Sequence, residues 1–591
     1  MYSRRLLIIT VLAAGLGVVG GVAAWALLRL IGFTTNLALY GRFGWELPPT
    51  TELERSPALI IAPVIGALIV ATMARAEPII RGHGIPEAME SILLRQSRIR
   101  PLAALLKPLS AAVAIGTGGP FGAEGPIIVT GGASGSLLGQ LIPVSPAERK
   151  VLLASGAAAG MCATFGAPLA SIVLAFELLL FEFSRRSLIP VAAATAVAGG
   201  MHIWLFGSGP LFSVPVEEFA GISALPKYAG LGILCGLLAV VVARGLFLVE
   251  AIFRRLPVAE FWHPAIGAIV FGSIGLAVPR ALGVGYDVIE DMLSARLALA
   301  TVLALLVAKL VAWWFALGSG TSGGTLAPIL IVGSAFGSAV ALAVNDVLPV
   351  EVSASGFALV AMAATFGASI GGSLTSIVFV FELTQDYRIL LPLILASVLA
   401  DLVASAFLSE TIMTEKLSRR GLRVVRDYRA DPFSQVQVGD VMTAPAITLP
   451  DDATIADARK QVLTGRHNAY PLVDAAGISR GIISRTDLIN AGDAMGAVRD
   501  IASADVVTIG RSDTVSRAMA LLFDEDVEHL PVVDADGRVL GMCTRTDILR
   551  ARHRERDEDL RQAPPLLGTW PGTLRFTRLG NRGVPPNERS Q

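Results

Sequence analysis

The sequence predicts a polytopic all-α membrane protein, made of two repeated halves with broken helices and followed by a cytoplasmic pair of α/β domains. The first supporting observation is composition. Of the 591 residues, 53% are hydrophobic and only 16% are charged, whereas soluble globular proteins carry about 25% charged residues. The second is a series of long apolar runs between Leu6 and Leu408. The third is that one repeat occurs inside this apolar part and a different repeat follows it.

The charge balance and the cysteines exclude several classes of protein. The chain has 48 basic and 48 acidic residues, so no basic excess indicates binding to nucleic acid. Cys162, Cys235 and Cys543 lie far apart and lack the spacing of metal ligands. We therefore expect neither a disulfide framework nor a metal site, and the sequence requires no cofactor.

The first apolar run, Leu6–Ile31, follows Arg4 and Arg5. This run is longer than the apolar region of a signal peptide, so it is predicted to be a membrane helix. The two arginines place the N-terminus in the cytoplasm. Many of the runs are long enough for the ~20 residues that cross a bilayer. The further runs are Ala58–Met73, Ala154–Phe181, Pro226–Phe253, Phe261–Val278, Leu297–Leu317, Gly356–Phe381 and Ile389–Phe407.

Three segments rich in glycine and proline interrupt the apolar part: Gly82–Met89, Gly116–Ile128 and Gly318–Leu330. Unwound backbone at membrane depth is tolerated only where it is buried in protein or lines a polar cavity. Broken helices of this kind form ion and solute sites in transporters. The alternative is that the glycines only allow helices to pack closely. We interpret the three breaks as parts of one ion or solute site.

The apolar part also contains an internal repeat. The segment Ala163–Leu178 (ATFGAPLASIVLAFEL) recurs as Ala364–Leu383 (ATFGASIGGSLTSIVFVFEL) with a short insertion. The glycine-rich breaks around Glu124 and Leu326 are separated by about the same number of residues as the two copies. Two homologous halves that meet at a site near the midplane are a transporter architecture.

A charged segment after Thr414 leads into the second repeat, in which Pro471–Ile489 is followed 60 residues later by Pro531–Leu549. Each copy predicts a strand, a turn at Asp/Gly, a second strand and a helix capped by Thr-Asp. Helical spacing upstream predicts helices at Asp452–Leu463 and Asp513–Phe523. The predicted organisation is a membrane domain at 1–417, a linker at 418–436, small domains at 437–492 and 493–552, and a disordered tail at 553–591.

The apolar part from Arg4 to Leu417 resembles the CLC family of chloride channels and chloride/proton exchangers. The family's motifs appear in order as GxGIP (Gly82, Gly84, Ile85, Pro86), GxEGP (Gly122, Glu124, Gly125, Pro126) and GxxxP (Gly324, Pro328). Their order and spacing, together with the repeat, are more specific than any single glycine motif. The second repeat resembles a pair of CBS domains, which commonly follow the membrane part in this family.

The resemblance implies a homodimer in the lipid bilayer that transports anions, chloride first of all, with one pathway per subunit and a regulatory CBS pair. Half-helices that begin at the breaks would direct backbone N–H groups and positive helix ends at one point, which favours an anion. By resemblance, Glu124 is the gating glutamate, whose carboxylate occupies an anion position and moves away when protonated. The alternative is an acidic helix cap. The expected anion-binding residues are Gly82, His83, Gly84, Ile85, Pro86, Gly122, Gly125, Pro126, Thr325, Leu326, Ala327 and Met413.

The sequence departs from the family at several of these positions. His83 stands where a serine is expected, Leu326 replaces a phenylalanine, Met413 aligns with a tyrosine, and Ala123 occupies a position that is usually basic. These departures put chloride selectivity in question more than anion transport. His83 is interpreted either as a neutral N–H donor or as a titratable anion ligand. Lys107 either matches a basic position of the family or is a lysine that snorkels to the interface.

The position that relays protons in exchangers of this family aligns with Leu178, which cannot carry a proton. Its neighbour Glu177 is mirrored by Glu382 in the other half, which favours a structural role at a helix end for both. We therefore expect channel-like conduction, with a chloride/proton antiporter as the alternative. Further alternatives are a cation transporter, which would need carboxylates facing the pore, and a membrane sensor that does not transport.

CBS domains often bind adenine nucleotides through an acid that follows a threonine. Thr486-Asp487 and Thr546-Asp547 match that pattern, and the alternative is that each pair only caps a helix. The chain contains no Walker A loop and no HExxH motif, and its GxSxG matches lie outside a strand–turn–helix context. We therefore do not expect an enzyme.

Overall fold

The computed structural model describes residues 2–212, 222–349, 351–420, 436–465, 467–491 and 495–551. Its internal contacts divide the chain into two compact units, Met1–Tyr428 and Arg429–Gln591. The disordered tail expected at 553–591 and most of the linker expected at 418–436 lie outside the described residues.

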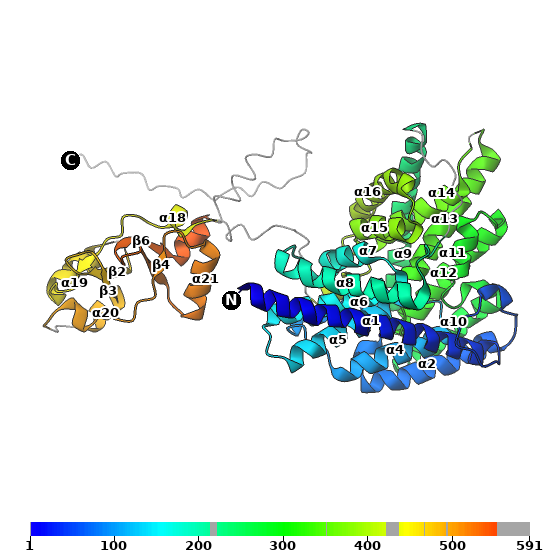
Figure 1. Ribbon diagram of the computed structural model, residues 1–591, viewed down its shortest axis with the longest axis horizontal. Coiled ribbons are helices and arrows are strands. Elements are labelled where there is room, and N and C mark those ends of the chain that lie inside the picture. Colours follow the sequence, from blue (N-terminus) through cyan, green and yellow to red (C-terminus); the bar gives the residue numbers. More distant parts are fainter. Residues whose placement is uncertain are drawn as a thin grey trace, which may run out of the picture. The chain divides into compact units, whose positions relative to one another are not determined.

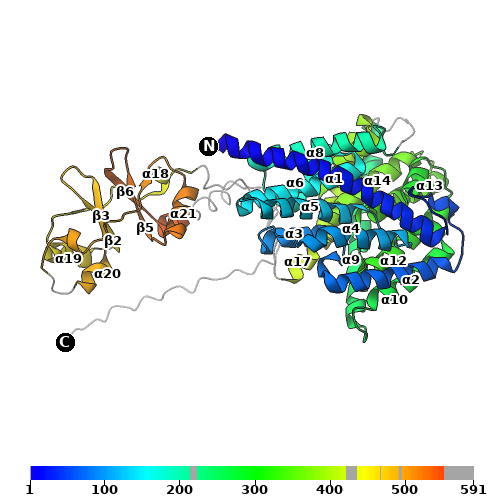
Figure 2. The same cartoon turned by 60° about the horizontal axis from the view of Figure 1, so that its bottom comes forward.

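The first unit is built from helices in two successive halves (Figures 1 and 2). The first half contains α1 (Tyr2–Leu39), α2 (Ala58–Ala76), α3 (Ile85–Leu94), α4 (Pro101–Gly116), α5 (Glu124–Leu141), α6 (Pro146–Phe165), α7 (Pro168–Leu174) and α8 (Arg185–Phe206). The second contains α9 (Leu225–Arg255), α10 (His263–Ala277), α11 (Tyr286–Leu293), α12 (Leu299–Gly318), α13 (Leu326–Val347), α14 (Ala354–Ile370), α15 (Ser373–Thr384) and α16 (Leu390–Phe407). The short helix α17 (Glu415–Arg419) follows. In Figure 1, α1 crosses the unit and packs against α6 and α8.

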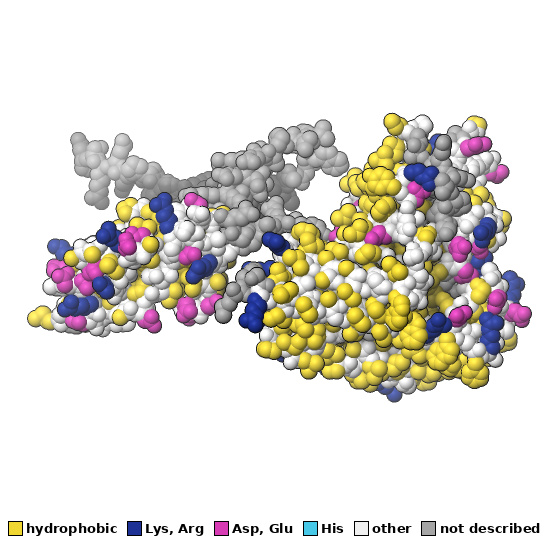
Figure 3. Space-filling model, in the orientation of Figure 1, with side chains coloured by type: hydrophobic (Ala, Val, Ile, Leu, Met, Phe, Trp, Pro, Cys, Tyr) yellow, Lys and Arg dark blue, Asp and Glu magenta, His cyan; other side chains and the backbone are white. Residues whose placement is uncertain are grey.

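The surface of this unit is that of a membrane protein. Seven helices in the described part of the chain, α1, α2, α8, α9, α12, α13 and α16, are long and apolar enough to cross a membrane. Large apolar side chains such as Leu7, Ile61 and Leu402 are more than half exposed on three of them. Figure 3 shows a broad hydrophobic face over this unit, with charged side chains near its margins. A soluble monomer rarely exposes so large an apolar surface.

Two of the apolar runs are interrupted within their length. The run at 154–181 contains α6 and α7, which are separated at Gly166, and the run at 356–381 contains α14 and α15, which are separated at Gly371. Both glycines have left-handed backbones, with φ of +66° and +69°, that end the preceding helix. The structure also adds α8 and α13, two long apolar helices that lie outside the predicted apolar runs, and it extends the first helix to Leu39.

The two halves cap each other's helices. Glu382 of the second half accepts hydrogen bonds from the amides of Leu169 and Ala170 at the start of α7, at 2.9 and 2.7 Å. Glu177 of the first half accepts a bond from the Thr375 amide at the start of α15, at 2.8 Å. A reciprocal contact of this kind is the signature of a twofold relation. The predicted helix-end role of both glutamates is confirmed.

The second unit contains two similar sheets. The first copy has β1 (Leu449–Pro450), α19 (Ile455–Thr464), β2 (Ala469–Val473), β3 (Ser479–Ser484) and α20 (Arg485–Asn490), and the second has β4 (Ile509–Gly510), α21 (Val515–Asp524), β5 (His529–Val533), β6 (Val539–Thr544) and a helix from 545 to 551. In each sheet the first strand is parallel to the second and the second is antiparallel to the third. This is the predicted order of strand, turn, strand and helix.

One detail of the second unit differs from the prediction. The cap of α20 is Ser484, whose hydroxyl accepts a bond from the Asp487 amide, so the helix begins before Thr486. Thr544 makes the same bond with the Asp547 amide in the second copy. The predicted Thr-Asp pairs therefore lie inside the first turn, where Asp487 completes a capping box from the third helical position.

Candidate functional site

The three glycine-rich breaks, which lie far apart in the sequence, meet in the fold. The structure pairs the backbone of Gly82 with that of Ser322 and the backbone of Gly122 with that of Gly324. The Gly324 amide donates to the Gly122 carbonyl at 3.0 Å. Because α3, α5 and α13 begin directly after these segments, the N-terminal ends of three helices lie together. The first N–H groups of a helix lack partners within the helix and carry partial positive charge.

Glycine is required where α3 and α5 approach each other. A Cβ atom on Gly125 would lie 2.0 Å from the His83 carbonyl oxygen, and one on Gly84 would lie 2.5 Å from the Gly125 carbonyl oxygen. Gly84 also has a φ of +101°, which other residues rarely adopt. The glycines of the GxGIP and GxEGP motifs are therefore required for steric reasons, because they allow the first residues of α3 and α5 to lie in direct contact.

The predicted anion-binding residues mostly occupy these helix starts. Gly82, His83, Gly84, Ile85 and Pro86 lie at the start of α3, Gly122, Gly125 and Pro126 at the start of α5, and Thr325, Leu326 and Ala327 at the start of α13, and all are buried. Met413 is also buried, in the segment that follows α16. The neighbouring Ile412 amide donates to the Ser369 carbonyl. A methionine thioether has no donor to offer an anion.

Glu124 is the first residue of α5 and is fully buried. Because the N-cap of α5 is Ala123, the interpretation of Glu124 as an acidic N-cap is wrong. Its Oε1 accepts a hydrogen bond from the Tyr286 hydroxyl at 2.8 Å. Its Oε2 makes no hydrogen bond of normal geometry, although the Ala327 amide is close enough to interact with the carboxylate. The side chain therefore lies between α11 and the start of α13.

Two further polar groups at the helix starts are buried without a partner. The Nδ1 atom of His83, a residue that is 2% exposed, and the Oγ1 atom of Thr325, which is 0% exposed, make no hydrogen bond in the structure. Buried polar atoms are nearly always hydrogen-bonded, so such atoms call for an explanation. A hydroxyl and an imidazole N–H at converging helix starts are donors that an anion would satisfy.

Two buried lysines support the loops beside this site. The Nζ atom of Lys107 donates to the carbonyls of Ile80 and Gly82, both at 2.8 Å, and Lys309 Nζ donates to the Gly283 carbonyl at 2.8 Å. Lys107 is 0% exposed, so the interpretation that it snorkels to the interface is wrong. Lys107 thereby satisfies carbonyls at the first break, and Lys309 satisfies one in the loop before α11.

Sequence reasoning missed Tyr286 and Lys309. A signal was present: Gly82-His83-Gly84 in the first half has a counterpart in Gly283-Val284-Gly285 of the second. A buried lysine follows each GxG segment at nearly the same interval. By this pairing, Tyr286 is the counterpart of Ile85. The sequence does not show that the Tyr286 hydroxyl donates a hydrogen bond to Glu124, a contact that only the fold brings about.

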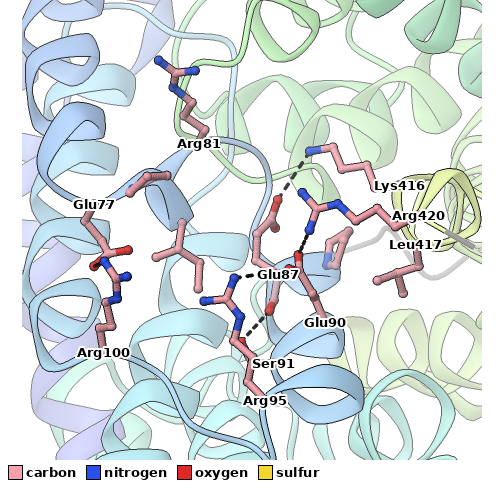
Figure 4. Close-up of a pocket in the computed structure, with 13 residues that line it drawn as sticks. Glu77, Arg81, Glu87, Glu90, Ser91, Arg95, Arg100, Lys416, Leu417 and Arg420 are labelled. Carbon is pink, nitrogen blue, oxygen red and sulfur yellow. Dashed lines mark hydrogen bonds and ion pairs between the residues drawn. The ribbon is translucent and has the colours of Figure 1, made fainter. Parts of the chain in front are cut away.

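A charged pocket of about 410 Å³ opens beside α3 (Figure 4). Lys416 of α17 reaches Glu87 Oε1 at 3.4 Å, and Arg420 pairs with Glu90. The other oxygen of Glu87 accepts the Gly84 amide at 2.7 Å. Figure 2 shows α17 beside α3. The end of the first unit is therefore tied to the loop that begins α3.

In the second unit, the two predicted nucleotide-binding acids hold helix starts. Asp487 Oδ2 accepts from the amide and hydroxyl of Ser484, both at 2.8 Å. Asp547 Oδ2 accepts from the corresponding groups of Thr544, and Asp547 Oδ1 accepts from the Thr443 hydroxyl at 3.1 Å. Both oxygens of Asp547 are therefore engaged.

Comparison with known proteins agrees with this architecture. The sequence model of the family described as voltage gated chloride channel matches residues 65–405, and that of the CBS domain matches residues 438–493 and 498–554. The chain is 30% identical over 444 residues to the H(+)/Cl(-) exchange transporter ClcA of Yersinia pestis, covering 70% of this chain and 90% of the relative. It is 30% identical over 435 residues to the chloride channel protein CLC-f of Arabidopsis thaliana, covering 66% of this chain and 53% of that protein.

Solved structures show the same fold. A crystal structure of a slow cyanobacterial Cl-/H+ antiporter matches with a TM-score of 0.61 at 24% identity, covering 70% of this chain and 97% of that one. A eukaryotic CLC transporter matches with a TM-score of 0.58 at 17% identity, covering 92% of this chain and 98% of that one. From its motifs, converging helix starts and relatives, this chain is a membrane protein of the voltage gated chloride channel (CLC) family of anion transporters, with two CBS domains at its C-terminal side.

Proposed function

We propose that this protein carries chloride through a pathway at the starts of α3, α5 and α13, and that the Glu124 side chain gates it. The observation that carries the proposal is the set of buried polar atoms without a hydrogen bond at these starts: His83 Nδ1, Thr325 Oγ1 and Glu124 Oε2. The first two atoms can belong to donors for an anion. The third belongs to a carboxylate whose other oxygen accepts the Tyr286 hydroxyl at the start of α11.

The charges around the proposed site favour weak, reversible binding of an anion over tight binding. Three helix starts supply partial positive charge, and the Lys107 and Lys309 side chains nearby donate to backbone carbonyls. An anion then meets N–H and O–H donors instead of a direct ammonium contact. A conducting site must bind strongly enough to admit the ion and weakly enough to release it. The Glu124 carboxylate competes for the same positive region until it is protonated or swings aside.

For proton coupling we propose the antiporter rather than the channel. The Yersinia pestis relative, which the chain covers to 90%, is named an H(+)/Cl(-) exchange transporter and does not support the expected channel-like conduction, although the Arabidopsis thaliana relative is named a chloride channel protein. Uncoupled conduction remains a second candidate because Leu178, at the relay position, is buried and apolar. If the antiporter is correct, the proton crosses the inner half by a route that does not use residue 178.

The test is a flux measurement on the purified protein in liposomes with a chloride gradient. Chloride efflux and external pH are recorded together, for the unsubstituted protein and for Glu124→Gln. We expect proton uptake in fixed proportion to chloride efflux. In Glu124→Gln we expect continued chloride efflux without proton movement, because the amide does not titrate. Glu182→Gln is the control, since Glu182 is an exposed acid outside the site.

The outcomes separate the candidates. Chloride efflux without proton movement in the unsubstituted protein would contradict the antiporter and favour the channel. A proton signal and an efflux rate that Glu124→Gln leaves unchanged would contradict the gating role. If chloride does not move, the same assay with other monovalent anions tests whether His83 has changed the selectivity. A His83→Ser variant with an unchanged pH profile would exclude a titratable ligand at position 83.

We further propose that the CBS pair binds an adenine nucleotide and regulates transport through α17. Support comes from the ion pair of Lys416 with Glu87 and the bond of Glu87 to the Gly84 amide, which together join α17 to the start of α3. The first nucleotide site is favoured over the second, because both oxygens of Asp547 are already engaged. Backbone N–H groups at a helix start would face the phosphates.

The assembly and orientation of the chain are also proposals. The family resemblance supports a homodimer, which size-exclusion chromatography with light scattering would show as twice the 61.8 kDa chain mass. Arg4 and Arg5 before the first membrane helix support a cytoplasmic N-terminus. Labelling of a cysteine introduced at residue 3, in sealed vesicles, tests this orientation.

A further inference from the structure

We propose that Tyr286 is the latch of the gate: its hydroxyl holds the Glu124 carboxylate in the closed position and thereby sets the rate and the pH dependence of transport. The inference rests on the proposed gating role of Glu124. Tyr286 is a positioning residue, because it acts on the anion only through that carboxylate.

The contact is direct and shielded from water. Tyr286 OH donates to Glu124 Oε1 at 2.8 Å, and it is the side-chain donor that the structure assigns to this carboxylate among the described residues. Glu124 is 0% exposed, so water does not compete for the bond. A hydrogen bond to a charged group is stronger than one between neutral groups. The other carboxylate oxygen lacks a bond of normal geometry, which leaves the tyrosine as the main side-chain restraint.

The tyrosine is held in place by contacts that do not involve its hydroxyl. Its ring packs edge-on against Phe165 and Phe212, with centroids 6.3 and 6.4 Å away. The preceding loop is anchored where Lys309 Nζ donates to the Gly283 carbonyl, and the next residue, Asp287, accepts the Thr50 hydroxyl at 2.6 Å. Removing the hydroxyl alone therefore leaves the ring, the loop and α11 in place.

Tyr286 also lines a second pocket, of about 240 Å³, together with Tyr40, Thr50 and Asp287. This pocket brings open space to the side of the tyrosine that faces the loop between α1 and α2. Glu124 is not among the residues that line this pocket. Tyr40 serves as a matched control, because its hydroxyl binds the Pro49 carbonyl at 3.0 Å and does not contact Glu124.

The expected direction follows from the charge of the acceptor. The Tyr286 hydroxyl stabilises the ionised, seated carboxylate, and it does nothing comparable for a carboxylate that has swung away. Other groups that act on Glu124 are the Lys309 ammonium on α12 and the Ala327 amide on α13, and Tyr286→Phe leaves both unchanged. Without the hydroxyl, the seated carboxylate is easier to protonate and easier to displace. Anion transport therefore becomes faster at neutral pH.

The experiment compares four proteins in the liposome assay between pH 4.5 and 8: unsubstituted, Tyr286→Phe, Tyr40→Phe and the double variant Tyr286→Phe with Glu124→Gln. A charge-assisted bond corresponds to roughly tenfold in rate. We expect Tyr286→Phe to raise efflux at pH 7.5 by about that factor and to move the pH of half-maximal efflux upward by about one unit. Tyr40→Phe should match the unsubstituted protein. The Tyr286 substitution should have no effect when Glu124 is already glutamine.

Each outcome has a definite meaning. If Glu124→Gln changes the pH profile but Tyr286→Phe does not, the proposed role of Tyr286 is wrong, whereas the proposed gating role of Glu124 is supported. If Glu124→Gln itself leaves the profile unchanged, the proposed gate is overturned. An equal effect of Tyr286→Phe with and without Glu124 would show that the tyrosine acts elsewhere, which also overturns the latch. Thermal unfolding of each variant in detergent confirms that the substituted proteins are folded, and a folded Tyr286→Phe variant without faster efflux counts against the proposal.

Discussion

At the scale of single residues, the Glu124 carboxylate fits in its position because the neighbouring Gly122 has no side chain. A Cβ atom on Gly122 would lie 1.7 Å from Glu124 Oε2, whereas one on Gly132, further along α5, would make only ordinary contacts beginning at 3.5 Å. This position of the Glu124 carboxylate and a side chain at residue 122 are therefore incompatible. Because the obstructing atom is the end of a flexible side chain, the carboxylate can move while the backbone stays.

This contact predicts that Gly122→Ala holds the gate open. We expect chloride efflux to rise above that of the unsubstituted protein at pH 7.5, and its pH dependence to flatten, because the carboxylate can no longer take its seat. The liposome assay measures both. Gly132→Ala, a substitution of the same size in the same helix, should change neither. Normal pH dependence in a folded Gly122→Ala variant would contradict the seated position of Glu124.

At the scale of elements, the starts of α7 and α15 depend on glutamates from the opposite half. Glu177 supplies one carboxylate oxygen to the Leu374 amide and the other to the Thr375 amide and hydroxyl, and Glu382 likewise supplies two oxygens to the start of α7. A charged group at a helix start satisfies orphan N–H groups and interacts favourably with the helix dipole. These contacts join the two halves.

The predicted effect of Glu177→Ala is therefore on stability. Loss of a helix cap costs about 1 kcal/mol, which we expect to lower the unfolding temperature in detergent by a few degrees. The ratio of protons to chloride should stay the same. Glu182→Ala, an exposed acid a few residues away, is the control for unfolding. A collapse of the coupling ratio with unchanged stability would instead identify Glu177 as a proton carrier, in place of the missing acid at residue 178.

At the scale of the whole molecule, the chain joins a membrane unit to a separate CBS unit. The last described helix of the membrane unit, α17, contacts the loop that begins α3 through Lys416 and Glu87. A displacement of α17 would therefore reach the Gly84 amide through two polar contacts. This is a short physical connection between the end of one unit and the proposed anion site.

We predict that an adenine nucleotide alters chloride efflux in the unsubstituted protein and that Lys416→Met weakens this effect several-fold, because the contact to Glu87 is lost. Nucleotide binding, measured by calorimetry on the full chain, should persist in Lys416→Met and decrease in Asp487→Asn. Lys150→Met, which loses an ion pair with Glu182 elsewhere on the unit, is the control. If no nucleotide binds or changes efflux, the regulatory role of the CBS pair is wrong.

Much of this architecture is readable from the sequence. Apolar runs predicted five of the seven long apolar helices among the described residues, because burial in lipid imposes a local composition on some twenty consecutive residues. The strand and helix order of the CBS unit followed from local patterns in the same way. Local patterns also have limits. They placed the cap of α20 at Thr486 instead of Ser484. They also did not show that two of the apolar runs each contain two helices, because a single left-handed glycine is enough to end a helix.

Local patterns in the sequence established the membrane class, the two-fold repetition and the family, and they pointed to Glu124 as a gating residue, because motif order and hydrophobic periodicity are properties of neighbouring residues. The fold was needed to show that Lys107 is buried against carbonyls, that Glu177 and Glu382 cap helices of each other's halves, and that the Tyr286 hydroxyl donates to Glu124. Each of these is a contact between residues distant in the chain. Such contacts depend on where packing brings the helix starts together, which local composition does not encode.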